Sequence, residues 1–155
     1  MSAPPATPAT PAAPDPLLAG KKVMIEYTQP NPFKPFHIGH LMSNAIGESL
    51  SRIIEASGAT LVRANYQGDV GLHVAKALYG ILQKGKPAAD LTVSAQAEYV
   101  GTLYSWASEL YDTDPEIKKE IDAINKKVYD RSDENINELY DWGREVTLAA
   151  FEILY

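Results

Sequence analysis

Residues 22–40 read KVMIEYTQPNPFKPFHIGH, and this stretch decides how the chain begins to fold. Its first seven residues, 22–28, form a short run with apolar, aromatic and β-branched side chains, between a glycine and a proline. That pattern predicts a buried strand. Three prolines follow at Pro30, Pro32 and Pro35. Because each fixes φ and disfavours helix in the residue before it, the connection after the strand should be a stiff loop.

A helix is expected directly after this loop. From Gly39 onward, apolar residues recur at the spacing of one helical face, and Gly58 supplies a C-terminal stop. Residues 60–66 then predict a second strand. The order strand, helix, strand indicates two parallel strands, the beginning of a Rossmann-type sheet. The expected fold class is therefore α/β: the first half of a Rossmann-type parallel nucleotide-binding fold, followed by a mostly helical insertion.

Four helices are expected in the rest of the chain. They should cover about 70–83 and 93–110, a stretch that begins at the capping signal of residues 113–116, and a final stretch from about 133 to 155. Gly85 and Pro87 interrupt the pattern between the first two. We therefore expect three parts: a leader at 1–19, a partial Rossmann core with the loop at 20–84, and a helical insertion at 85–155.

The first 19 residues predict a disordered leader. They hold 6 of the 11 prolines and 6 alanines with a single charge, so they lack an apolar face for packing. They also lack the basic start and apolar centre of a secretory signal. No stretch approaches the roughly 18 apolar residues of a membrane span, and the chain has no cysteine. A cytoplasmic protein without membrane contact is the expectation.

Charge is distributed unevenly along the chain. Residues 1–80 carry 6 Lys and Arg against 5 Asp and Glu, whereas residues 81–155 carry 8 against 15. Because binding to nucleic acid depends largely on cationic groups that displace counterions from phosphate, the acidic second half predicts a poor RNA-binding surface.

The residues around His37-Ile38-Gly39-His40 carry a family resemblance. The tetrapeptide is the "HIGH" signature of class I aminoacyl-tRNA synthetases, and its context resembles the arginyl-tRNA synthetases in particular. That context consists of Glu26, Pro30-Asn31-Pro32, Lys34-Pro35-Phe36, Asn44 to Gly47, Asn65-Tyr66 and Gly68-Asp69-Val70-Gly71. The resemblance implies an arginine-tRNA ligase that uses ATP with Mg²⁺ to form arginyl-adenylate from L-arginine and passes the arginyl group to tRNA.

The resemblance also implies the residues that bind ATP. His37 and His40 would donate to phosphate oxygens as negative charge develops, and losing one such donor typically costs roughly 2.7 to 4 kcal/mol. At the amino end of a helix they would share its free amides and its positive dipole end. Gly39 would let the adenine ring lie on the backbone. Lys34 would reach the same phosphates and replace the signature lysine of the "KMSKS" loop, which is absent from this sequence.

A second group of residues is implied to bind arginine. Glu26, at the end of the first strand, can match a guanidinium with two parallel hydrogen bonds. Asn31 would hold the α-amino group, and Asn65 and Asp69, after the second strand, could line the same pocket.

Plainer explanations stay open for each of these residues. His37 and His40 could join His73 on a metal ion, although the nearby lysine argues against a cation and we expect no metal site. Lys34 could be an ordinary solvated lysine, and Glu26 could pair with a basic residue at the sheet edge. The segment 68–71 could be an ordinary turn; it also imitates the loop of KH modules, but without the charge that RNA requires.

Three functions remain possible at this point. The first is a partial catalytic domain of an arginine-tRNA ligase, because the sequence lacks the second half of the nucleotide fold and the anticodon-binding helices. Such a fragment would hold tRNA poorly. The second is a non-catalytic nucleotide-binding or assembly fragment that needs a partner chain, which predicts exposed apolar surface on an open sheet edge. The third is a small HxGH nucleotidyltransferase.

Overall fold

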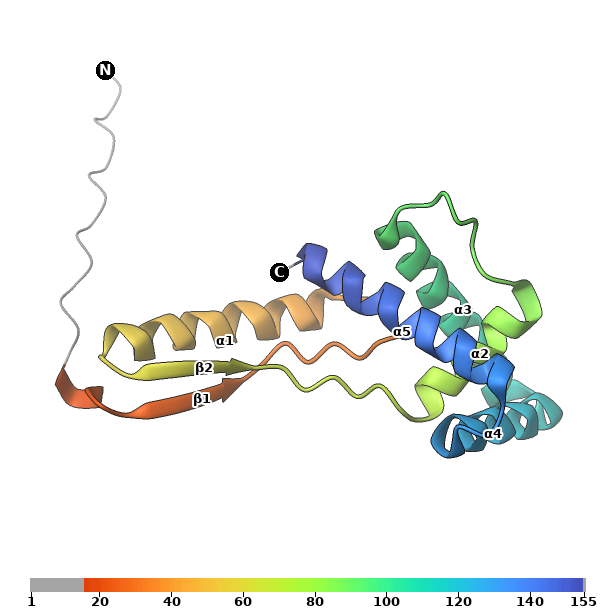
Figure 1. The fold of residues 1–155 in the computed structure, drawn as a ribbon, viewed down its shortest axis with the longest axis horizontal. Helices are drawn as coiled ribbons and strands as arrows, with labels where there is room; N and C mark the ends of the chain where they lie inside the picture. The colour runs from red at the N-terminus through yellow and green to blue at the C-terminus, as the bar shows by residue number, and fades with distance from the viewer. Residues whose placement is uncertain (1–15, 155) are drawn as a thin grey trace, which may run out of the picture. The chain divides into compact units, whose positions relative to one another are not determined.

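The structure, a computed structural model, describes residues 16–154 (Figure 1). The predicted leader therefore lies mostly outside the described residues. The described elements are the 3-10 helix η1 (Pro16–Leu18), strands β1 (Lys22–Glu26) and β2 (Thr60–Ala64), and helices α1 (Ile38–Ala56), α2 (Leu72–Lys84), α3 (Val93–Thr113), α4 (Pro115–Asp130) and α5 (Glu134–Leu154). They confirm the predicted α/β class, and each predicted strand and helix is present within a few residues of its expected bounds.

Contacts within the chain divide it into two compact units. The first, here called the strand unit, comprises residues up to Thr28 together with Met42–Asn65, and so contains β1, β2 and most of α1. The second, here called the helical unit, comprises Gln29–Leu41 and residues from Tyr66 onward. The domain boundary expected near residue 84 stays a prediction.

In the strand unit, β1 and β2 form a parallel pair in the register Lys22↔Thr60 to Glu26↔Ala64. Both strands end two residues earlier than predicted. After β1, Thr28 and Gln29 adopt positive φ angles of 70° and 52° and turn the chain out of the ladder. Helix α1 approaches the strand closely at Gly47. A β-carbon there would lie 2.2 Å from Cγ of Tyr27, so this contact requires glycine.

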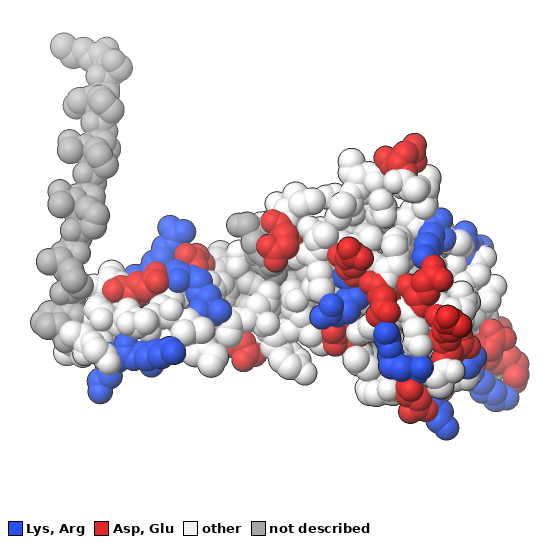
Figure 2. Space-filling model, viewed as in Figure 1, with Lys and Arg blue, Asp and Glu red and all other residues white. Residues whose placement is uncertain are grey.

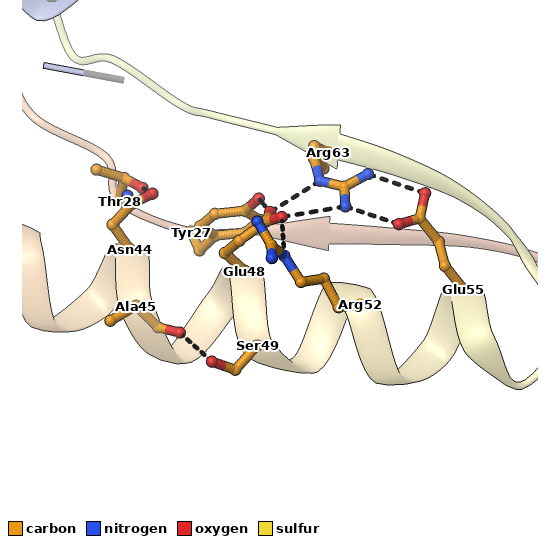
Figure 3. A network of polar contacts seen from close by, with 9 residues as sticks. All are labelled: Tyr27, Thr28, Asn44, Ala45, Glu48, Ser49, Arg52, Glu55 and Arg63. Atoms are coloured by element: carbon orange, nitrogen blue, oxygen red, sulfur yellow. Dashed lines mark hydrogen bonds and ion pairs between the residues drawn. The ribbon is translucent and has the colours of Figure 1, made fainter. Parts of the chain in front are cut away.

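Helix α1 and β2 are also joined by an ionic network (Figure 3). The guanidinium of Arg63 on β2 donates to Glu48 at 2.9 Å and to Glu55 at 2.8 Å, both on α1. Arg52 and the Tyr27 hydroxyl donate to Glu48 as well. The hydrogen bonds from Arg63, Arg52 and Tyr27 lower the pKa of Glu48 to about 2.

The strand unit leaves apolar side chains uncovered. The prediction that the first strand is buried is wrong for Met24, which is 65% exposed. The sheet of the described chain has only two strands, and the Arg63 bonds join it to α1 through polar groups that do not cover this side chain. Other large apolar side chains that are at least one-third exposed in this unit are Leu17, Met42, Ile46, Leu50, Ile53 and Val62.

The helical unit has a conventional core. Helices α2 to α5 contact one another, and the buried residues include Val74, Leu78, Val100, Ile121 and Ile136. Local signals set the starts of two helices. The Thr92 side chain caps α3. The Asp114 side chain caps α4 by accepting from the backbone N–H groups of Glu116 and Ile117, and Pro115 is the first residue of that helix. Acidic and basic side chains alternate over the visible face of this unit (Figure 2).

No helix among residues 16–154 combines the length and the apolar character that crossing a bilayer requires.

Candidate nucleotide-binding site

The loop between β1 and α1 starts from a polar anchor in the strand unit. The Thr28 backbone N–H donates to Oγ of Ser43 at 3.2 Å, and its hydroxyl donates to Oδ1 of Asn44 at 2.7 Å (Figure 3). Thr28 is 5% exposed. The bond to Ser43 gives the Thr28 N–H a partner at the point where the chain leaves β1. The prolines of the loop restrict its backbone but do not supply this bond.

Further along, the loop is anchored in the core of the helical unit by Phe33. This side chain is fully buried, and its ring stacks on Tyr140 with centroids 5.8 Å apart. Phe33 has a φ of 66°, and its N–H donates to Oγ1 of the buried Thr147 at 3.4 Å. A side chain with no exposed surface thus fixes the loop directly before Lys34.

The two histidines meet at the first turn of α1. The helix begins at Ile38, so His37 occupies its N-cap position. The Gly39 N–H donates to Nδ1 of His37 at 3.1 Å, and the His37 N–H donates to Nδ1 of His40 at 3.2 Å. The two rings stack, with centroids 3.8 Å apart and planes 22° apart. The structure therefore brings together the two imidazoles that the sequence singled out.

Surroundings favour the neutral form of His40. Partial burial, and then the positive charges of His37 and Lys34, lower the pKa of His40 below its usual 6.5. Because this folded pKa is depressed, the contribution of His40 to stability is complete above about pH 6.5 and is lost as the pH falls through the lowered value. At neutral pH the ring is an uncharged donor and acceptor.

Lys34 lines a cavity, and its charge acts on His40. Its Nζ atom is 5.4 Å from the centre of the Tyr104 ring, and its charge acts on both His40 and His73. It lines a cavity of about 310 Å³ together with Phe36 and residues of α3 and α5, among them Glu98 and Phe151. Phe36 also lies 5.2 Å from the His40 ring, centre to centre. The lining of this cavity thus includes Lys34 and Phe36 but neither His37 nor His40.

Gly39 is exposed and tightly bounded on one side. A β-carbon at this position would lie 3.0 Å from Nδ1 and Cε1 of His37. Any side chain here would push the His37 ring away from the helix end, in addition to the clash with adenine that the family resemblance implies.

Asn31 and Asp69 hold the segment 68–71 in place. The Gly68 N–H donates to Oδ1 of Asn31 at 3.0 Å, and Nε2 of His73 lies 3.0 Å from the Gly68 carbonyl oxygen. The Asp69 carboxylate accepts from Nε of Arg144 on α5 at 2.7 Å. Both residues therefore have structural partners, and their part in arginine binding stays a prediction.

Glu26 and Asn65 lie at the matching ends of the two parallel strands. Glu26 is paired in register with Ala64, and Asn65 follows directly. Both belong to the strand unit, whereas Asn31, Lys34, His37, His40 and Asp69 belong to the helical unit.

The polar groups of this loop can donate hydrogen bonds to an anion. Among residues 16–154 no three His, Asp or Glu side chains are grouped to hold an ion. Imidazole N–H and ammonium groups donate hydrogen bonds, and such donors fit phosphate oxygens.

Three residues that contact the loop or the segment 68–71 were not predicted from the sequence. Tyr104, Thr147 and Arg144 reach the loop or the segment 68–71 from helices far along the chain; Arg144 is 75 residues from Asp69. Their spacing carries no local signal that could have found them.

The structure thus has a parallel strand, helix, strand unit with two stacked imidazoles at the amino end of its helix. Residues 15–155 match the family described as "tRNA synthetases class I (R), catalytic domain", and the chain belongs to this family of arginyl-tRNA synthetase catalytic domains.

Individual relatives agree with this assignment. The chain is 34% identical to an arginine-tRNA ligase of Clostridium botulinum over 88% of its own length and 24% of the relative's. It is 43% identical to that of Treponema pallidum over 56% of its length and 15% of the relative's. The solved arginyl-tRNA synthetase of Thermus thermophilus aligns at 25% identity with a TM-score of 0.66, covering 92% of this chain and 23% of that one. The chain thus spans about a quarter or less of the length of these relatives.

Proposed function

We propose that this chain supplies the first part of the catalytic domain of an arginine-tRNA ligase. In the proposed reaction, the carboxylate of arginine attacks the α-phosphorus of ATP, pyrophosphate leaves, and the arginyl group of the adenylate passes to tRNA. The observation that carries the proposal is the stacked pair His37 and His40 at the amino end of α1, in a chain that matches the family over residues 15–155.

The proposed ATP site consists of this pair with Gly39 and Lys34. The imidazoles and the ammonium group would stabilise the charge that gathers on the phosphate oxygens, and the helix end adds its own positive potential. Mg²⁺ bound to the nucleotide would neutralise part of the triphosphate charge; as a hard cation it prefers the phosphate oxygens to the nitrogen donors of this chain.

The proposed arginine site consists of Glu26, Asn31, Asn65 and Asp69. The carboxylate of Glu26, at the carboxyl end of a parallel strand, would bind the guanidinium. Asn31 and Asp69 would act partly through the segment 68–71, which their hydrogen bonds hold. The tRNA partner would be held mainly by other parts of a complete enzyme, because residues 81–155 carry 15 acidic against 8 basic residues. The proposed location is the cytoplasm.

The uncovered apolar surface of the strand unit favours a second candidate function. Met24 is 65% exposed and Ile53 is 61% exposed, on the sheet and on α1 respectively. A fragment that binds nucleotide but needs a partner chain to complete its sheet would have such a surface.

Arginine-dependent exchange of pyrophosphate into ATP, measured with and without tRNA, separates the two candidates. The ligase proposal predicts exchange by the wild-type chain, no exchange by His40→Ala, and normal exchange by Ser49→Ala on the same helix. ATP binding without exchange would favour the fragment that needs a partner. Exchange with another acid in place of arginine would instead indicate a nucleotidyltransferase.

A further inference from the structure

The two histidines of the tetrapeptide hold each other and the helix end in a reciprocal arrangement. His37, at the N-cap position, accepts from the backbone N–H two residues ahead, at Gly39. His40, three residues after the cap, reaches back and accepts from the backbone N–H of His37. In the familiar capping box, a serine or threonine and a glutamate make an equivalent exchange.

We propose that His37 and His40 form a histidine capping box that fixes both imidazoles as the Nε2–H tautomer. In each ring Nδ1 then accepts a hydrogen bond at the end of α1, and Nε2–H is the donor that remains for a ligand. The proposal deepens the proposed function, on which its ligand part rests: the same two bonds that start the helix would decide which nitrogen faces the phosphates.

The tautomer of each ring follows from the backbone N–H group that its Nδ1 atom meets. A backbone N–H can only donate, so the nitrogen that it meets must carry a lone pair. Both Nδ1 atoms meet a backbone N–H, at 3.1 and 3.2 Å. The remaining proton of each neutral ring therefore lies on Nε2.

The positive charges near His40 also favour its neutral form. The rings stack with centroids 3.8 Å apart, so two protonated imidazoles would repel each other at close range. The other groups that face His40 are the Lys34 ammonium, whose charge disfavours a second cation, and the uncharged ring of Phe36. A protonated Nδ1 would also lose the capping bond, since it could no longer accept.

The capping box gives Gly39 a second role. Its N–H is the donor to His37, and a β-carbon would press on the same ring at 3.0 Å. A side chain at position 39 would therefore displace the capping ring of His37 by a few tenths of an ångström, before any nucleotide binds.

The tautomers can be read directly from the full chain labelled with ¹⁵N. Long-range ¹H–¹⁵N correlation at about pH 7.5, without nucleotide, should show an unprotonated Nδ1 and a protonated Nε2 for both His37 and His40. A protonated Nδ1 on either ring, or a rapidly exchanging mixture, would overturn the proposal.

Paired substitutions separate the cap from the ligand. Asparagine places an acceptor near the position of Nδ1, whereas glutamine places a donor near Nε2. His37→Asn should keep the hydrogen exchange of the Gly39 amide within twofold of wild type but weaken ATP binding about tenfold or more. His37→Gln should do the reverse, with exchange at Gly39 about fivefold faster. His73→Gln, outside the box, should leave the Gly39 amide unchanged.

Equal protection of the Gly39 amide in the Asn and Gln variants would also overturn the capping box. Because tautomer and amide exchange are measured without nucleotide, a failure to bind ATP would count against the proposed function alone.

Discussion

The strand unit and the helical unit differ in what they bury. Among residues 16–154, every buried large apolar side chain belongs to the helical unit, including Phe33 from the loop. The buried residues of the strand unit are Thr28, Gly47 and Ser51, and its links between sheet and helix are mainly polar. Since apolar burial supplies most of the free energy of folding, the helical unit should be stable by itself and the strand unit should depend on additional contacts.

The largest expected effect is a cavity in the core of the helical unit. Leu78 has no exposed surface, so Leu78→Ala should lower the free energy of unfolding by about 2 to 5 kcal/mol. Urea unfolding followed by tryptophan fluorescence reports on this unit, because Trp106 and Trp142 both lie in it. Ile46→Ala on α1, where the side chain is 51% exposed, is the matched substitution in the strand unit. Amide hydrogen exchange of α1, which reports on that unit, should show a change in stability of less than about 0.5 kcal/mol. Equal losses from the two substitutions would erase the contrast between the units.

The two units should also differ in ligand. Glu26, in the strand unit, is proposed for arginine, and Lys34, in the helical unit, for ATP. Glu26→Ala should weaken arginine binding by about 1.5 to 3 kcal/mol and spare ATP, the typical contribution of a hydrogen bond to a charged group. Calorimetric titration with each ligand measures the split. Equal loss of both ligands would show that the carboxylate is structural.

A tighter contact within the strand unit should have the next effect. Gly47→Ala would place a β-carbon against the Tyr27 ring, and overpacking of this kind typically costs about 1 to 3 kcal/mol. Amide hydrogen exchange of β1 and α1 should accelerate, while the unfolding of the helical unit stays unchanged. Ser49→Ala, on the exposed side of the same helix, serves as the control. Destabilisation of both units together would mean that they unfold as one.

The smallest expected effect is a pH dependence confined to the strand unit. The pKa of Glu48 is lowered to about 2, so its contribution to stability is present above about pH 4.5 and is lost as the pH falls towards 2. Amide exchange of β2 and α1 should therefore accelerate in this range. In Glu48→Gln that acid-induced step should be smaller but not absent, because the hydrogen bond from Arg63 also lowers the pKa of Glu55. If the stability of β2, measured by amide exchange in the wild-type chain, did not change between about pH 4.5 and 2, the stabilising role of the network would be contradicted.

Local signals in the sequence predicted most of the fold. Proline and glycine positions placed the loop and the helix ends, and the capping residues Asp114 and Pro115 marked the start of α4. The prediction of a buried first strand failed at Met24, because an apolar run does not show whether neighbouring strands are present to cover it.

The residues of the candidate site stay a prediction, and the contacts that hold them were not predicted. His37 and His40 were singled out by the family resemblance of their tetrapeptide, and their three-residue separation allows the mutual capping that the structure shows. The pairing of Asp69 with Arg144 depends on how α5 packs, and no short-range pattern encodes a contact between residues 75 positions apart.

The central claim is that the loop after β1 presents two imidazoles and one ammonium group to the phosphates of a nucleotide. Titration of the ¹⁵N-labelled chain with ATP, followed by amide chemical shifts, tests it most directly. The account predicts the largest shifts at His37, Gly39, His40 and Lys34. Shifts that leave these four residues unchanged and gather elsewhere, such as the cavity between α3 and α4 at Tyr111 and Lys118, would contradict it.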